Sequence, residues 1–209
     1  FSKYGFDERI IVIIDGFDRL ADSQDAFLQL ATAFPKNVTL IVSSADEKLT
    51  QISSKFDVIR LDSLSSSDVV TFVEAYLKEY AKRLTDAQRM HIAGCSLLRN
   101  PSLLVLMLEE LLQFGIFERL DEYIDNFLRA TTPEEFVDIV LSRLDTDFYN
   151  ASHLFSLLAL CRIGIPESEL VRMLDVNPVE WASLYGAAQP MLNNIGGYVQ
   201  LRSETIRNA

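Results

Sequence analysis

The chain has 209 residues, enough for one large domain or two to three small ones, and its formal net charge is −11. This acidic balance disfavours a general nucleic-acid binder, because counterion release from phosphates requires a positive surface. No apolar run approaches the roughly twenty residues of a membrane span, and the N-terminus lacks the layout of a signal peptide. Cys95 and Cys161 lie far apart, inside apolar helical patterns. We therefore expect a soluble, cytoplasmic protein without a disulfide framework or membrane contact.

The opening third alternates strand-like and helix-like patterns. Short apolar runs at 10–15, 38–43 and 57–61 predict strands, and the first two lack strict alternation, which is typical of strands covered on both faces. Helical spacing lies between them, at 22–34 and 47–56. This order of elements predicts an α/β region, 1–62, with a parallel sheet and crossover helices.

From Leu64 onward the strand-like runs stop and amphipathic helical patterns follow one another. Serines precede the first pattern as caps, Pro101 and Pro133 stand close to helix starts, and Gly115 lies just past a helix end. The sequence therefore predicts an all-α block, which we assign to 63–148.

The last sixty residues change character again. Three short helical patterns are followed by a glycine-turned hairpin near 195–202, which suggests a winged-helix domain at 149–209. Its candidate recognition segment, 177–201, contains no Lys or Arg, although phosphate anchoring and guanine readout depend on them. We expect no direct DNA binding by this domain and a role in packing against a neighbouring domain.

The stretch IIVIIDGFDRL, residues 10–20, places carboxylates where a parallel strand ends. Ligands bind beyond the carboxyl ends of such strands, and Gly16 lets the backbone leave the sheet without an obstructing side chain. Asp15 is placed to hold Mg²⁺ through water, and Asp18 could orient an attacking water. The pattern by itself also fits a strand that ends in a polar turn, with Asp15 as a cap and Asp18 solvated.

The order of these elements resembles the STAND class of signal-transducing P-loop ATPases, in its NACHT-like branch. IIVIIDGFDRL resembles the Walker B segment of that family, and VTLIVSSAD, one crossover later, resembles its sensor 1 strand. The stretch from Arg99 to Leu128 is similar to the helical lid of the telomerase-associated protein and nephrocystin relatives. The resemblance covers nearly the whole chain. It implies the distal part of a P-loop, AAA+-like sheet, followed by the lid and a winged helix.

The resemblance also implies roles for four residues at the strand ends. Asp15 would coordinate magnesium, and Asp18 would be the catalytic base nearest the hydrolytic water. Ser43 or Ser44 would sense the γ-phosphate of ATP from the neighbouring strand, since a hydroxyl both donates and accepts.

Further positions fall on the lid and the winged helix, and some depart from the family pattern. Pro101 matches the lid proline that packs against adenine, although a plain helix-start proline explains it equally well. Ser203 stands where relatives often place a histidine that locks the ADP-bound state. Arg19 replaces a second acidic residue, and Ala45 stands where many relatives carry a sensor arginine.

No GxxxxGK[ST] motif occurs in the chain, so it has no loop of backbone amides to cradle phosphates. We infer that the chain begins after the P-loop of a longer protein, and that alone it neither binds ATP well nor hydrolyses it. In the intact protein, ATP or ADP with Mg²⁺ would switch a closed monomer to an oligomerising form, in defence or stress signalling. The alternative is a non-hydrolysing, nucleotide-gated scaffold or protein-interaction module, which Arg19 and Ala45 favour.

Overall fold

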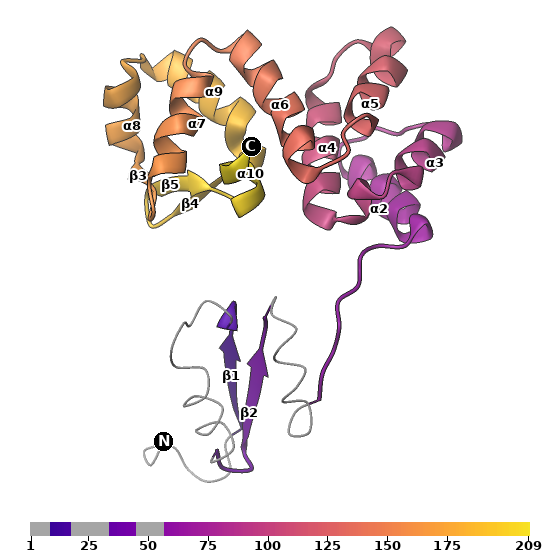
Figure 1. Ribbon diagram of the computed structural model, residues 1–209, viewed down its shortest axis with the longest axis vertical. Helices are drawn as coiled ribbons and strands as arrows, with labels where there is room; N and C mark the ends of the chain where they lie inside the picture. The colour runs from indigo at the N-terminus through magenta and orange to yellow at the C-terminus, as the bar shows by residue number, and fades with distance from the viewer. Residues whose placement is uncertain (1–8, 18–33, 45–56) are drawn as a thin grey trace. The chain divides into compact units, whose positions relative to one another are not determined.

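A computed structural model of the chain describes residues 9–17, 34–44 and 57–209 (Figure 1). The chain divides into two compact units, unit 1 at residues 1–61 and unit 2 at residues 62–209. Within the described ranges, no helix is both long enough and apolar enough to cross a membrane.

Unit 1 contains two of the three predicted strands. The strands β1 (Ile10–Ile14) and β2 (Val38–Val42) pair in parallel, in a register that runs from Ile10 opposite Val38 to Ile14 opposite Val42. Their side chains alternate between a half-buried face and an exposed face, as the period of two in a strand allows. The sequence pattern predicted strands covered on both faces, and the exposed face differs from that prediction. The predicted crossover helices at 22–34 and 47–56 lie, apart from Phe34, outside the described residues.

The third predicted strand, at 57–61, is wrong. Residues 57–65 adopt no regular secondary structure, and the side chains of Ile59 and Leu61 are 86% and 96% exposed. An apolar, β-branched run becomes a strand only when another strand pairs with it, and none of the described strands lies beside this one. The segment is instead an extended connection that leads into unit 2.

The first part of unit 2 is a succession of helices, as predicted. They are α2 (Ser66–Glu79), α3 (Asp86–Gly94), α4 (Pro101–Gln113), α5 (Leu120–Leu128) and α6 (Pro133–Asp147), with short 3₁₀ turns η3 (Leu97–Arg99) and η4 (Phe117–Arg119). Local sequence explains where they begin. Ser65 and Thr85 form capping boxes at α2 and α3, while α4 and α6 each open with a capping residue followed by proline.

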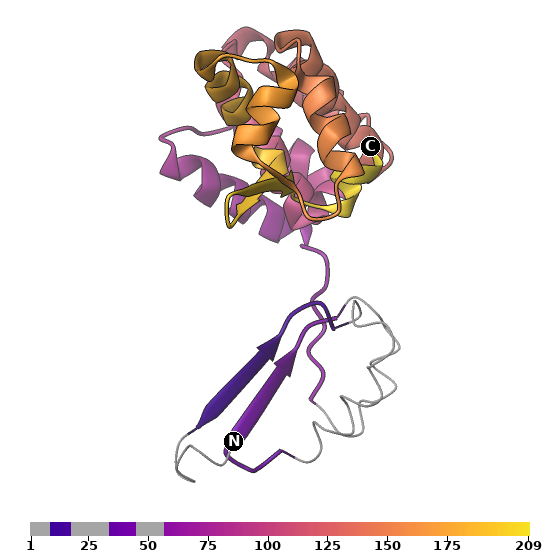
Figure 2. The ribbon, with the colours of Figure 1, turned by 90° about the vertical axis from the view of Figure 1, so that its left-hand side faces the viewer.

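The second part of unit 2 contains the three predicted helices and the predicted hairpin. The helices α7 (Ala151–Leu160), α8 (Glu167–Leu174) and α9 (Pro178–Ala188) lead through η5 (Gln189–Met191) into β4 (Leu192–Ile195) and β5 (Tyr198–Leu201). Gly196 and Gly197, both with positive φ, make the hairpin turn. The hairpin lies at one end of the neighbouring helices (Figure 2).

Two short elements of this part were not predicted. The strand β3 (Ile165–Pro166) pairs with β5 and gives the antiparallel sheet the order β3-β5-β4. The helix α10 (Glu204–Asn208) closes the chain, and the Arg207 guanidinium donates to backbone carbonyls at the end of α7, with distances of 2.5 Å to Ala159 and 3.2 Å to Cys161. These bonds satisfy carbonyls that a helix end leaves unpaired. The succession of elements is compatible with the winged-helix assignment, which itself stays a prediction.

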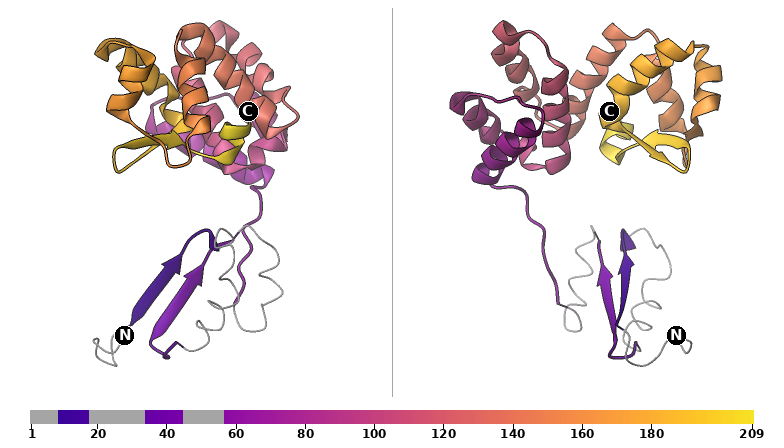
Figure 3. Two further views of the ribbon diagram at one scale, coloured as in Figure 1. Left: turned by 60° about the vertical axis from the view of Figure 1, so that its left-hand side comes forward. Right: turned by 180° about the vertical axis from the view of Figure 1, so that it is seen from behind.

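One apolar core runs through the whole of unit 2. It includes Phe127 of α5, Phe136 of α6 and Leu154 of α7, all nearly or fully buried. The helix α6 lies between α4 and α5 on one side and the C-terminal helices on the other (Figures 1 and 3), and it packs more extensively on α7 and α10. The predicted boundary between 63–148 and 149–209 therefore falls inside a shared core, and it stays a prediction.

Candidate functional site

The structure brings Asp15 and Ser43 together where β1 and β2 end. The two strands are parallel and in register, so the residues that follow Ile14 and Val42 emerge side by side. The Ser43 hydroxyl donates to the Asp15 carboxylate, and it accepts a hydrogen bond from the backbone N–H of Gly16, at 2.9 Å. Because an ionised carboxylate can only accept hydrogen bonds, the Ser43 hydroxyl is the donor in this pair.

The backbone around this pair is held by its own hydrogen bonds. The N–H of Ser43 donates to the carbonyl of Ile14, and the N–H of Phe17 donates to the carbonyl of Ser43, both at 2.9 Å. Gly16 has φ of +66°, a conformation that is costly for other residues, and it allows the chain to turn back over the end of β2. Phe17 is fully buried, which anchors the turn.

The Asp15 carboxylate is exposed to solvent, and one of its oxygens is paired with the Ser43 hydroxyl. Both Asp15 and Ser43 are exposed, and Ser43 is the only described residue whose side chain donates to the carboxylate. Mg²⁺ binds proteins through one or two carboxylates and otherwise keeps water or substrate phosphate oxygens. Among the described residues, no three His, Cys, Asp or Glu side chains gather into a metal site. Asp15 could therefore supply one carboxylate ligand of a hydrated magnesium ion, whose other ligands would be water and phosphate.

Of the other residues that the sequence places at this site, the structure describes only Ser44. Ser44 is exposed and directly follows Ser43. Asp18, Arg19 and Ala45 lie outside the described residues, so the role of Asp18 as catalytic base stays a prediction.

Pro101 and Ser203, the predicted nucleotide contacts of the later domains, both stand at helix starts of unit 2. Pro101 is the exposed first residue of α4, after Asn100, whose side chain accepts from the N–H of Ser102 at 2.9 Å. Ser203 caps α10, and its hydroxyl accepts from the N–H of Ile206 at 3.3 Å. Of the predicted site residues that the structure describes, Asp15 and Ser43 contact each other in unit 1. Pro101 and Ser203 belong to unit 2, and their place in a nucleotide site stays a prediction.

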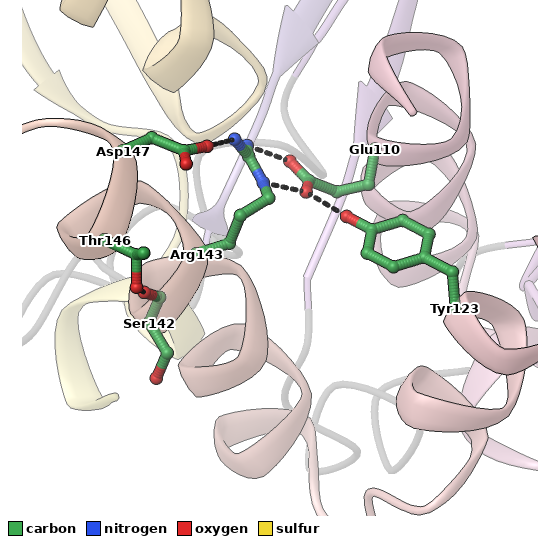
Figure 4. Close-up of polar contacts among 6 residues, drawn as sticks. All are labelled: Glu110, Tyr123, Ser142, Arg143, Thr146 and Asp147. Carbon is green, nitrogen blue, oxygen red and sulfur yellow. Dashed lines mark hydrogen bonds and ion pairs between the residues drawn. The ribbon is translucent and has the colours of Figure 1, made fainter. Parts of the chain in front are cut away.

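A buried polar cluster in unit 2 was missed by the sequence analysis (Figure 4). Its centre is Glu110 of α4, whose side chain is only 1% exposed. The guanidinium of Arg143, on α6, donates to both Glu110 oxygens, at 2.5 Å from Nε and 2.7 Å from Nη2. The Tyr123 hydroxyl, on α5, adds a third hydrogen bond at 2.9 Å, and Arg143 also donates to Asp147 at 3.1 Å.

The surroundings of this cluster stabilise its charged form. Tyr123 stacks on Phe114, with ring centroids 4.1 Å apart. Burial, together with the charge and hydrogen bond of Glu110, raises the pKa of Tyr123, so its hydroxyl stays a donor. Burial by itself lowers the pKa of Arg143, but the hydrogen bond and charge of Glu110 outweigh it, and the net pKa is raised. Arg143 therefore remains a cation at every physiological pH.

The cluster forms part of the wall of an open cleft of about 840 Å³. One wall comes from the end of α4, the loop after it and α5, and the other comes from α6 and Ala187 of α9. A signal for Glu110 was present in the sequence, because it stands three residues after Met107 and seven after Leu103, on the buried face of α4. An acid on such a face indicates a buried partner.

No family model matches the chain. The chain is 29% identical, over 220 aligned positions, to a TPR repeat-containing protein of Dictyostelium discoideum. The alignment covers 97% of this chain but only 13% of that relative. The chain is thus similar to a small part of a much longer protein.

Proposed function

We propose that this chain is the segment after the Walker A motif of a NACHT-like STAND ATPase. The observation that carries the proposal is the pairing of the Asp15 carboxylate with the Ser43 hydroxyl at the carboxyl ends of two adjacent parallel strands. In an open parallel sheet this edge is where ligands bind. A carboxylate and a hydroxyl held together at this edge suit a magnesium-bound phosphate group.

In this proposal each residue of the strand-end pair has its own task. Asp15 holds hydrated Mg²⁺, which in turn neutralises charge on the phosphates of ATP. Ser43 donates either to Asp15 or to a phosphate oxygen, so its hydrogen bond reports whether the γ-phosphate is present. Asp18 orients the attacking water. The phosphate cradle comes from an upstream P-loop segment of the same protein.

The helical unit supplies the response to the nucleotide. Pro101 offers adenine a flat apolar surface without a donor, and Ser203 contacts the ADP state in place of the histidine of related proteins. The Ser203 hydroxyl accepts from Ile206, which leaves its proton free to be donated to a ligand. ATP and ADP then shift the balance between a closed monomer and an oligomerising form through their different affinities for the two.

The longer relative supports a role inside a larger assembly. Its name describes it as a TPR repeat-containing protein, and this chain aligns with 13% of its length. We propose that the segment acts in the cytoplasm as the switch of such a protein, in defence or stress signalling, with further copies of itself as partners.

The test requires the full-length protein that contains this segment. We expect Asp18→Asn to lower ATP turnover about 100-fold or more while ATP binding persists, because loss of a general base has an effect of that order. Asp15→Asn should weaken magnesium-dependent nucleotide binding. The control is Asp57→Asn, the same change at an exposed aspartate outside the site. Wild-type turnover in Asp18→Asn would rule out Asp18 as the base, and magnesium-dependent binding unchanged in Asp15→Asn would contradict the site itself.

A second function from another class is a nucleotide-gated scaffold that does not hydrolyse ATP. Arg19 and Ala45 favour it, because they replace an acid and an arginine that act in hydrolysis in related proteins. Oligomer size measured with ATP, with ADP and without nucleotide separates the two functions. A scaffold assembles with ATP although the wild type shows no turnover, whereas a hydrolytic switch disassembles as ATP is consumed.

A further inference from the structure

Two groups of helices in unit 2 meet at the cleft that contains the buried polar cluster. The chain crosses from α5 to α6 through Arg129, Ala130, Thr131 and Thr132. Directly after this crossing, Phe136 packs against Phe127, with ring centroids 5.1 Å apart. The crossing and this ring contact join α6 to α5 at the start of α6.

The groups also meet at the ion pair between Glu110 and Arg143, and where α4 contacts η5. Arg143 stands seven residues after Phe136, so it lies about 10 Å further along the helix axis at 1.5 Å per residue. Here the neighbouring space is open, because Glu110, Arg143 and Asp147 all line the cleft of about 840 Å³.

The two contacts constrain α6 in different ways. Burial of apolar rings is not directional, so the packing of Phe136 on Phe127 fixes the orientation of α6 less tightly than hydrogen bonds do. The fork of two hydrogen bonds from Arg143 to Glu110 is directional, and it is satisfied over a narrow range of positions. Tyr123 narrows the range further, since it holds the Oε2 atom that Arg143 Nε also contacts.

We propose that Glu110 and Arg143 form a latch that sets the angle between α2–α5 and α6–α10. A buried ion pair adds little net stability compared with apolar residues of similar size, so its main effect here is on geometry. The helices α7 and α10 pack on α6, and they move with it when the latch opens. The latch requires neither nucleotide nor the strand-end pair, so it stands independently of the proposed function.

The experiment measures the angle directly in the 209-residue chain. Cys95 and Cys161 are first replaced by alanine. Glu79 of α2 and Glu169 of α8, two exposed positions, are then replaced by cysteine and spin-labelled. Pulsed electron paramagnetic resonance then gives the distribution of distances between the labels. We expect one narrow maximum for the otherwise unchanged chain, and a shift to a broad distribution or a second, longer maximum for Glu110→Gln.

Two double variants separate geometry from stability. Replacement of both Glu110 and Arg143 by methionine should keep the helix content and the melting transition while the distance distribution stays broad. The charge swap, Glu110→Arg with Arg143→Glu, should narrow the distribution again because the pair is restored. The control replaces both Arg119 and Glu122, an exposed ion pair at the rim of the same cleft, by methionine, and should leave the distances unchanged.

Two results would overturn the proposal. A folded double methionine variant with the narrow distribution of the parent would show that apolar packing alone sets the angle. A double methionine variant that loses its cooperative melting transition would show that the ion pair is needed for folding rather than for orientation.

Discussion

Units 1 and 2 differ in how their described elements are stabilised. In unit 1, β1 and β2 pair over five residues each, and Ile11, Ile13 and Ile41 are at least half exposed. In unit 2, helices and strands from α2 to α10 contribute side chains to one apolar core. A parallel pair of strands is normally buried on both faces, whereas a helix needs only one covered stripe. Unit 2 therefore contains its own stabilising contacts, whereas the described strands of unit 1 leave apolar side chains exposed.

Separating the two units should give the largest effect. We expect residues 62–209 to unfold cooperatively on their own, because their core is closed within the unit. Residues 1–61 should show no cooperative transition, since the two strands described there are short and leave apolar side chains exposed, and an isolated pair of strands is at best marginally stable in water. Urea denaturation followed by far-UV circular dichroism measures both, with the 209-residue chain as reference. A cooperative transition in 1–61 would show that unit 1 is stable by itself.

Removal of one core ring from unit 2 should have the next largest effect. Phe136 is fully buried and contacts Phe127, so Phe136→Ala should lower the free energy of unfolding by about 3–5 kcal/mol. Phe117 is 80% exposed, and Phe117→Ala, the matched control, should change it by less than about 0.5 kcal/mol. Chemical denaturation of the two variants gives both values. Equal effects would mean that unit 2 does not depend on this core.

The same contrast explains which elements could be predicted from the sequence. Helix starts are encoded locally, as Ser65 with Asp68 and Thr85 with Gln88 show, so the helices of unit 2 were found. The strand predicted at 57–61 was wrong because residues with high β propensity form a strand only when another strand pairs with them. The strand β3 and the helix α10, of two and five residues, are too short to produce a periodic pattern.

The candidate sites divide in the same way. Asp15 and Ser43 could be placed near each other because the carboxyl ends of neighbouring parallel strands meet at one edge of a sheet. Glu110 and Arg143 stand 33 residues apart on different helices, and their pairing depends on how α4 and α6 pack. The position of Glu110 on an apolar face could have shown that a partner exists, but not which residue it is.

The smallest expected effect concerns the capping box of Ser65 and Asp68 at the start of α2. Hydrogen bonds from the Ser65 hydroxyl and, second, from the Ser65 backbone lower the pKa of Asp68 below its usual 3.8. A lowered folded pKa contributes stability above the unfolded value, and this contribution is lost as the pH falls through the folded value. Asp68→Asn should therefore reduce the protection of α2 amides from hydrogen exchange at pH 6, and the difference from wild type should shrink as the pH falls below about 4. Asp138→Asn, at an exposed position of α6, is the control and should show no such difference. A difference that stays constant with pH would mean that the side-chain shape, and not the carboxylate charge, caps α2.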